Sequence, residues 1–227
     1  MYWQEKTEDS VGYKVPEDVI DVVFKIRCKM VPIDHAQVLS DEVIRVLPWM
    51  LDENCAIHLI HVADSAHGWE CPKGEGESIH TSRRTKFKLR IPSHRFNDAQ
   101  KIVGKTLNIA GNDLTVLEGV KKTLSKMTTI FARYIDTQGE EEEEPFLNRM
   151  NKELLAKGIK VKKMMPGLIV KHQLKDGVRL TRKLMLSELE VEESVLLQET
   201  GIGSDLQYGF GIFLPHKGIE AVNKTQE

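Results

Sequence analysis

The chain has 227 residues, 41% of them hydrophobic and 29% charged, and its formal net charge at pH 7 is −2. This length allows one large domain or two small ones, and no apolar run approaches the roughly 20 residues of a membrane-spanning helix. The polar first residues contain no signal-peptide core, and the three widely spaced cysteines argue against a disulfide framework, so we expect a cytoplasmic protein with no membrane partner. The small net charge gives no overall argument for a nucleic-acid partner, which must therefore be sought in local clusters.

In the first half of the chain, the hydrophobic pattern predicts the element order β-α-β-β-α-β. Residues 19–30 alternate apolar and basic side chains, as in a half-buried strand. A helix follows, with Asp34 as its expected N-cap and Pro48 at its end. The further elements predicted here are strands at 56–62 and 82–91, a helix at 96–103 and a hairpin at 106–117, with a mobile arm at 1–16 and a long loop at 63–80.

The second half repeats this order without detectable sequence identity to the first. Its predicted elements are strands at 126–136, 168–173, 178–189 and 208–214 and helices at 145–156 and 191–199. The order β-α-β-β-α-β is that of the ferredoxin-like fold. We therefore predict an α+β protein of two tandem ferredoxin-like units, residues 17–120 and 121–222.

The most distinctive motif is the run of residues 201–213, which contains two Gly-X-Gly pairs formed by Gly201, Gly203, Gly209 and Gly211. The run follows a predicted helix and precedes a predicted strand, so it is not a dinucleotide-binding fingerprint. Glycine is used where φ is positive or where the backbone approaches a ligand closely. One interpretation is a loop whose N–H groups face outward to bind RNA phosphate; the other is a helix C-cap at Gly201 followed by an ordinary turn.

A second candidate site is the basic strand at residues 82–91. Alternation places four cations on one face of this strand, namely Arg84, Lys86, Lys88 and Arg90. A row of like charges favours contact with a polyanion such as RNA, although a solvated sheet face is the alternative. The corresponding strand of the second half carries three more candidate RNA-binding cations, Arg179, Arg182 and Lys183. Neither half has the aromatic run with which RRM sheets stack bases.

The histidines provide the candidate acid/base chemistry. His35 lies in the first turn of a predicted helix, where the dipole attracts phosphate and disfavours the imidazolium form. A neutral imidazole beside phosphate suits RNA transesterification, which needs no metal. The alternative is a first-turn histidine without a role. His58 and His61 are three residues apart on a predicted strand and so point to opposite faces, which argues against a joint metal site; we predict no cofactor.

With these motifs in order, the chain resembles the CRISPR repeat-processing endoribonucleases of the RAMP superfamily, in particular the MYXAN-type branch. The resemblance covers roughly residues 19–217, and it depends on the glycine run together with Pro32-Ile33-Asp34-His35 and Leu47-Pro48-Trp49. It implies two tandem ferredoxin-like folds that bind the CRISPR repeat hairpin in precursor RNA. It also implies one metal-independent cut that leaves a 2′,3′-cyclic phosphate or 3′-phosphate and a 5′-OH.

In this family a histidine near the start of the first helix is the usual general acid or base, which corresponds to His35, and His58 is a candidate supporting residue. The family also includes the alternative of a non-catalytic RNA-binding subunit, for which other subunits of a CRISPR effector complex would be partners. A third hypothesis is a ferredoxin-like interaction protein without nucleic acid, which the net charge of −2 allows.

Overall fold

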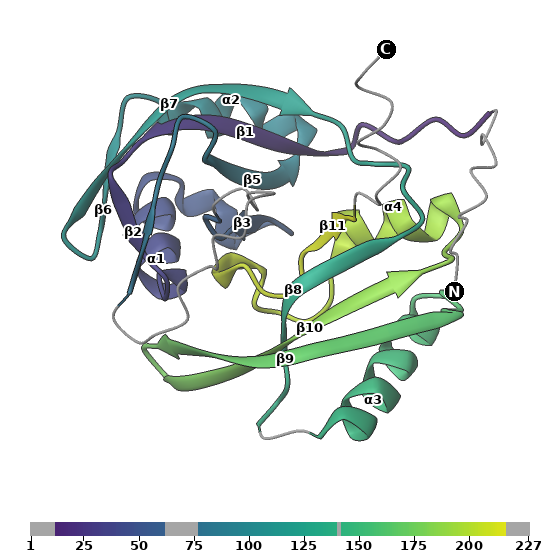
Figure 1. Cartoon of the computed structure of the whole chain (residues 1–227). Coiled ribbons are helices and arrows are strands. Elements are labelled where there is room, and N and C mark those ends of the chain that lie inside the picture. The colour runs from purple at the N-terminus through teal and green to yellow at the C-terminus, as the bar shows by residue number, and fades with distance from the viewer. Residues whose placement is uncertain (1–11, 62–76, 140–141, 217–227) are drawn as a thin grey trace, which may run out of the picture.

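The structure, a computed structural model, describes residues 12–61, 77–139 and 142–216. Figure 1 shows two sheets with helices packed against them, and the chain passes from the first sheet to the second between β7 and β8. The predicted arm at 1–16 and loop at 63–80 lie largely outside the described residues, as does the end of the predicted second unit. No helix within the described ranges is both long and apolar enough to cross a membrane.

The first sheet has five strands. In their order across the sheet, they are β3 (Ala56–His58), β5 (Lys86–Pro92), β1 (Val19–Arg27), β7 (Asn112–Lys122) and β6 (Thr106–Ile109). Strand β6 only extends a hairpin. When the other four strands are numbered by their order in the chain, their order across the sheet is 2-3-1-4, as in a ferredoxin-like unit. Phe24 and Phe87 are fully buried and stack with ring centroids 5.8 Å apart. Leu39 and Val43, four residues apart in α1 (Ala36–Val46), belong to the same core.

The second sheet has four strands. Their order is β11 (Phe213–Pro215), β8 (Ile130–Asp136), β10 (Gly177–Ser187) and β9 (Lys163–Leu174). This is the same topology, and the helices are α3 (Glu143–Ala156) and α4 (Val191–Thr200). Phe146, Met150 and Leu154 of α3 are fully buried in the core of this unit. The predicted α+β fold of two tandem ferredoxin-like units is therefore confirmed.

Several local predictions need correction. Strand β4 (Ser78–His80) lies within the predicted loop and pairs with β2 (Met30–Pro32) in a separate two-stranded sheet. The helix predicted at 96–103 is divided into α2 (Phe96–Ala99) and a 3₁₀ turn, η3 (Gln100–Ile102). Other 3₁₀ turns are η1 (Pro48–Leu51), η2 (Ser93–Arg95) and η4 (Leu206–Tyr208). Because η4 occupies its beginning, the last predicted strand starts only at β11.

Asp34 is not the N-cap of α1. His35 occupies that position and makes no side-chain cap bond. The Asp34 carboxylate instead accepts a hydrogen bond of 2.7 Å from the backbone N–H of Gln173 in β9. Asp34 therefore connects the start of the first helix to the second sheet, a contact that local sequence cannot indicate.

Candidate functional site between the two sheets

The predicted alternation of apolar and basic side chains in β5 is confirmed. Phe87 and Leu89 are fully buried on one face of the strand, and the basic residues lie on the other. Strand pairing places Arg90 opposite Asp21 and Lys88 opposite His58. Directly opposed residues share a face of the sheet. Basic, acidic and imidazole side chains are thus collected on the face that the first core leaves uncovered.

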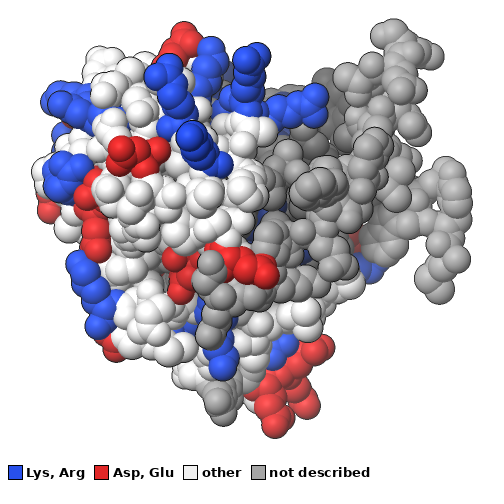
Figure 2. Space-filling model, turned by 60° about the vertical axis from the view of Figure 1, so that its left-hand side comes forward, with Lys and Arg blue, Asp and Glu red and all other residues white. Residues whose placement is uncertain are grey.

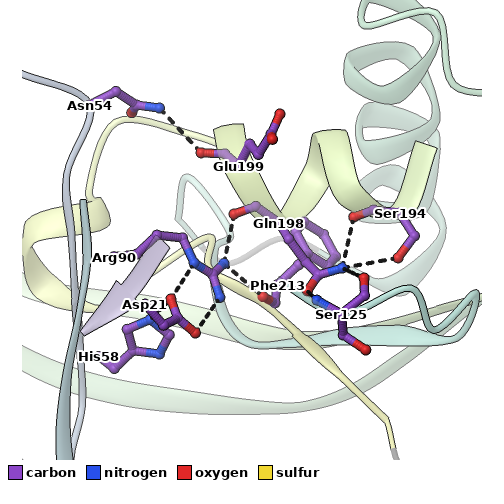
Figure 3. Close-up of polar contacts among 9 residues, drawn as sticks. All are labelled: Asp21, Asn54, His58, Arg90, Ser125, Ser194, Gln198, Glu199 and Phe213. Carbon is purple, nitrogen blue, oxygen red and sulfur yellow. Dashed lines mark hydrogen bonds and ion pairs between the residues drawn. The ribbon is translucent and has the colours of Figure 1, made fainter. Parts of the chain in front are cut away.

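At one end of this face, Arg90 joins the two units. Its side chain is buried, with 3% exposed, and donates to Asp21 Oδ1 at 2.8 Å and Oδ2 at 3.2 Å. Its Nη1 donates to the backbone carbonyls of Gln198 in α4, at 2.7 Å, and Phe213 in β11, at 2.9 Å. Figure 3 shows the guanidinium between these groups. The second unit thus covers Arg90, whose predicted role is RNA binding, and takes up its donors inside the protein.

His58 and Asp21 belong to the same closed network. The Nε2 atom of His58 lies 3.5 Å from Asp21 Oδ1. Burial alone would raise the pKa of Asp21, but Arg90 and His58 together hold it well below its usual value. Burial lowers the pKa of His58, although Asp21 opposes this shift. His58 is thus buried in this network, and its supporting role in catalysis stays a prediction.

The neighbouring Gln198 fixes the start of the second unit against α4. Its side-chain oxygen accepts from the backbone N–H of Ser125 at 3.0 Å, and its amide nitrogen donates to the Ser125 carbonyl at 2.8 Å. The same nitrogen lies 3.2 Å from the hydroxyl of Ser194. These bonds hold the chain between the two sheets against the helix whose end also binds Arg90 (Figure 3).

His35 is buried as well, with 1% exposed. Its Nδ1 donates to the carbonyls of Pro32, at 2.7 Å, and Ile33, at 3.0 Å, while Nε2 accepts the backbone N–H of Ile60 at 2.9 Å. These partners define one neutral tautomer, and burial lowers the pKa. Both ring nitrogens therefore bond to backbone groups in the interior, and the acid/base role of His35 stays a prediction.

The glycine run is folded inward. Gly201, with φ +61°, is the C-cap of α4, and its N–H donates to the Leu197 carbonyl. The N–H of Gly211 donates to the carbonyl of Tyr134 in β8 at 2.6 Å. A Cβ at Gly209 would lie 2.6 Å from Leu59 of the first unit. The N–H groups of Gly201 and Gly211 are therefore used inside the protein, and Gly201 takes the C-cap position of the alternative interpretation.

Gly203 differs from the other three glycines of the run. It is exposed, with φ +78°, and a Cβ there would have no neighbour within 4 Å. Of the four glycines predicted to bind RNA, Gly203 is the one whose backbone lies at the surface.

The three predicted cations of β10 also have different environments. Arg179 contacts three carboxylates, Asp136 at 2.7 Å and Asp176 and Asp205 at 2.8 Å each. Arg182 donates to the Gly167 carbonyl at 3.0 Å and lies over Phe146 of α3. These contacts engage Arg179 and Arg182 inside the protein, and their predicted role in RNA binding stays a prediction. Lys183 is exposed, with its Nζ 5.2 Å from the centroid of the Phe131 ring.

Around Lys88, cations of the two units come together in a more open environment than that of Arg90. Burial lowers the pKa of Lys88; Asp21 opposes this shift, whereas the charges of Lys122 and Arg133 add to it. The Arg133 guanidinium lies 5.2 Å from the centroid of the same Phe131 ring that Lys183 contacts. We call this set the open cationic strip; its members are Lys88, Lys122, Arg133 and Lys183. The two other predicted cations of the basic strand, Arg84 and Lys86, are exposed and half-buried, respectively.

Sequence reasoning missed Arg133 and its neighbour Tyr134, which stacks with His61 at a centroid distance of 5.8 Å. Both residues lie in a correctly predicted strand. The pairing of β8 with β10 has a register shift next to them, between Arg182 and Leu184. A bulge interrupts the alternation by which a sequence indicates the face of each side chain.

The surface in Figure 2 shows why the net charge was uninformative. Lysine and arginine side chains gather along its upper edge, whereas acidic and basic side chains are mixed below. A chain whose formal charge is −2 can therefore still present cations locally to a polyanion.

The fold and this interface define a protein of two ferredoxin-like units joined along a polar seam. The family model described as Cas6 Crispr matches residues 20–218, and the chain therefore belongs to the Cas6 family of CRISPR-associated proteins. This match confirms the resemblance found in the sequence. The CRISPR-associated endonuclease Cas6 of Myxococcus xanthus is 26% identical over 202 residues, which cover 86% of this chain and 81% of that protein.

Solved structures agree on the fold. A CRISPR-associated protein Cas6 superposes with a TM-score of 0.61 and 12% identity, covering 88% of this chain and all of the other. A Cas6-related protein of Pyrococcus furiosus superposes with a TM-score of 0.61 and 13% identity, covering 86% of this chain and 98% of that protein. A RAMP protein described as binding different RNA substrates superposes with a TM-score of 0.60 and 13% identity, covering 87% of this chain and 100% of that protein.

Proposed function

We propose that this chain is an endoribonuclease that cuts CRISPR repeat stem-loops in precursor RNA and so produces mature guide RNAs in the cytoplasm. Membership of the Cas6 family is the observation that carries this proposal. It is supported by a relative named as an endonuclease that shares most of its length with this chain. The units at 17–120 and 121–222 act as its two domains, although β7 continues to Lys122, across the proposed boundary.

The open cationic strip is the proposed RNA-binding surface. Lys88 and Lys122 come from the first unit, and Arg133 and Lys183 come from the second. Lys88 is partly desolvated beside other cations, which lowers its pKa. An RNA phosphate placed there would relieve this repulsion and release counterions from the nucleic acid. Arg84 and Lys86 extend the surface along the strand.

The proposed reaction is attack of a ribose 2′-OH on the adjacent phosphorus, with loss of the 5′-oxygen. Such a step needs a general acid/base and cations that stabilise the charged intermediate, and it needs no metal ion. The strip supplies cations at the junction of the two units. The products would be a 2′,3′-cyclic phosphate and a 5′-OH.

A non-catalytic RNA-binding subunit of a CRISPR effector complex is the second candidate function. One observation favours it: both ring nitrogens of His35, the residue predicted to be catalytic, are bonded to backbone in the interior. Such a subunit would use the same cationic strip and would bind a repeat hairpin without cutting it.

A cleavage assay in EDTA distinguishes the two functions. The purified protein is mixed with a labelled RNA stem-loop that matches a CRISPR repeat of its own genome. The control is the same RNA with a 2′-deoxyribose at the cut site, which cannot undergo transesterification. We expect one discrete cut of the all-ribose RNA and none of the control. Cutting that requires Mg²⁺ would contradict the proposed mechanism, and tight binding without any cut would favour the subunit.

A further inference from the structure

We propose that His61 is the catalytic acid/base residue of this chain, held against Tyr134 at the open part of the junction between the two units. The inference rests on the proposed nuclease function and assigns that function a residue that the sequence motifs do not indicate. His61 lies three residues beyond the end of β3, and Tyr134 lies in β8. The proposed site thus requires both units.

The geometry around His61 fixes its ring while leaving it partly exposed. The imidazole is partly exposed and stacks with the Tyr134 ring at a centroid distance of 5.8 Å and an interplanar angle of 30°. Tyr134 is itself held edge-on by His172, with centroids 4.7 Å apart, and it packs against Phe210 at 6.2 Å. The orientation of the His61 ring is therefore set by a stack that begins in the second unit.

The other histidines in this region are committed to the interior. His35 bonds backbone through both nitrogens, and His58 faces Asp21 in the Arg90 network. His172 is 4% exposed, with Nδ1 3.5 Å from Asp34 Oδ1 and Nε2 3.2 Å from the Thr181 hydroxyl. Among the described residues, no group forms a hydrogen bond or an ion pair with the His61 ring. Its nitrogens are thus available to a ligand.

The charged groups near His61 suit a residue that acts on a bound phosphate. The cations that act on the ring are Arg133 of β8 and Lys88 of β5, and the histidines His35 and His58 contribute in the same direction. Burial, together with these groups, lowers the pKa of His61 to about 3, so the imidazole is neutral at physiological pH. A phosphodiester bound to Lys88 and Arg133 would bring negative charge beside the ring and raise that pKa. Substrate binding itself would then prepare His61 to accept a proton.

In the proposed step, the proton of the 2′-OH passes to His61 and from there to hydroxide. His61 accepts the proton of the 2′-OH as the bond from the 2′-oxygen to phosphorus forms. The bond from phosphorus to the 5′-oxygen breaks, and the departing oxygen takes a proton from water. The resulting hydroxide then removes the proton from the His61 imidazolium. Lys88 and Arg133 would stabilise the added negative charge on the phosphoryl oxygens, since both carry positive charge beside His61.

The first test compares single-turnover cleavage by wild type, His61→Ala and His94→Ala in EDTA. His94 of η2 is the control histidine, because its side chain is 70% exposed and its Nε2 lies 3.3 Å from Glu53, which is not part of the proposed site. We expect His61→Ala to lower the rate at least about 100-fold, with unchanged affinity for a 2′-deoxy RNA, and His94→Ala to cut like wild type. Equal cutting by His61→Ala and wild type would overturn the assignment while leaving the nuclease intact. No cutting by wild type would instead overturn the proposed function.

A second measurement tests the ring directly, without turnover. The ¹⁵N chemical shifts of the His61 imidazole are followed against pH in the wild-type protein, with and without the 2′-deoxy stem-loop. Phosphate contact predicts that the pKa of His61 rises when the RNA binds. A His61 titration that saturating RNA does not change would overturn the proposal, because the phosphate would then be bound elsewhere.

Discussion

Arg90 and Lys88 lie two residues apart on the same face of β5, yet their surroundings differ completely. Arg90 donates to a carboxylate and to two carbonyls of the second unit, and it is buried. Lys88 is partly exposed among the cations Lys122 and Arg133. The two ends of one strand therefore perform different tasks: the Arg90 end holds the units together, and the Lys88 end is available to a polyanion.

The glycine run shows the same division on a smaller scale. Gly211 has its N–H and its carbonyl bonded inside the protein, whereas Gly203 is exposed at the surface. In both places a residue type that suggests RNA contact is used for packing where other segments of the protein cover it. Exposure, more than residue type, decides which candidates remain for binding.

The strongest test of this comparison is Arg90→Ala. The change leaves Asp21 buried without its main partner and removes two bonds to the second unit, so we expect a loss of about 3–5 kcal/mol in the free energy of unfolding. Urea denaturation, monitored by circular dichroism, measures this free energy of unfolding. Lys86→Ala, on the same face of the same strand, is the control and should change stability by less than about 0.5 kcal/mol. Similar losses for both variants would show that the Arg90 end is not the closed one.

The fold was largely predictable because its signals are local. Alternation in the first strand and helical spacing of Leu39 and Val43 each determine an element, and the order of elements then indicates the ferredoxin-like units. The short strand β4 was missed because its pairing with β2 joins segments nearly 50 residues apart in the chain. No local pattern reports such a pairing.

The candidate site was less predictable, because it is formed where one unit covers the other. Sequence placed Arg90 and Lys88 correctly on one face but could not show that α4 and β11 close over Arg90. It selected His35 by its place at the start of a helix, where backbone groups in fact take up both ring nitrogens. It passed over His61, whose setting depends on Tyr134 from the other unit.

A second, smaller effect compares two alanine substitutions in the glycine run. Both glycines have positive φ, +76° at Gly211 and +78° at Gly203, which costs an alanine about 1–2 kcal/mol. At Gly211 a Cβ would also lie 1.8 Å from the Ile202 carbonyl oxygen, adding about 1–3 kcal/mol of overpacking. Thermal or urea unfolding should therefore rank Gly211→Ala clearly below Gly203→Ala in stability. Equal stabilities would mean that the loop is not packed as tightly as Gly211 indicates.

The smallest expected effect compares two cations of β10 in RNA binding. Lys183 is exposed in the open cationic strip, whereas Arg179 is surrounded by Asp136, Asp176 and Asp205. If Lys183 neutralises one RNA phosphate, Lys183→Ala should reduce the slope of log affinity against log salt by about 0.7–0.9.

Arg179→Ala is the matched control and should leave that slope unchanged, because its charge is already balanced by carboxylates. Filter binding of a 2′-deoxy stem-loop RNA at several salt concentrations measures both variants without interference from cleavage. A slope that changes with Arg179 and not with Lys183 would move the RNA to the carboxylate-lined end of β10. The open cationic strip would then have to be abandoned as the binding surface, even if the Arg90 end proves to be closed.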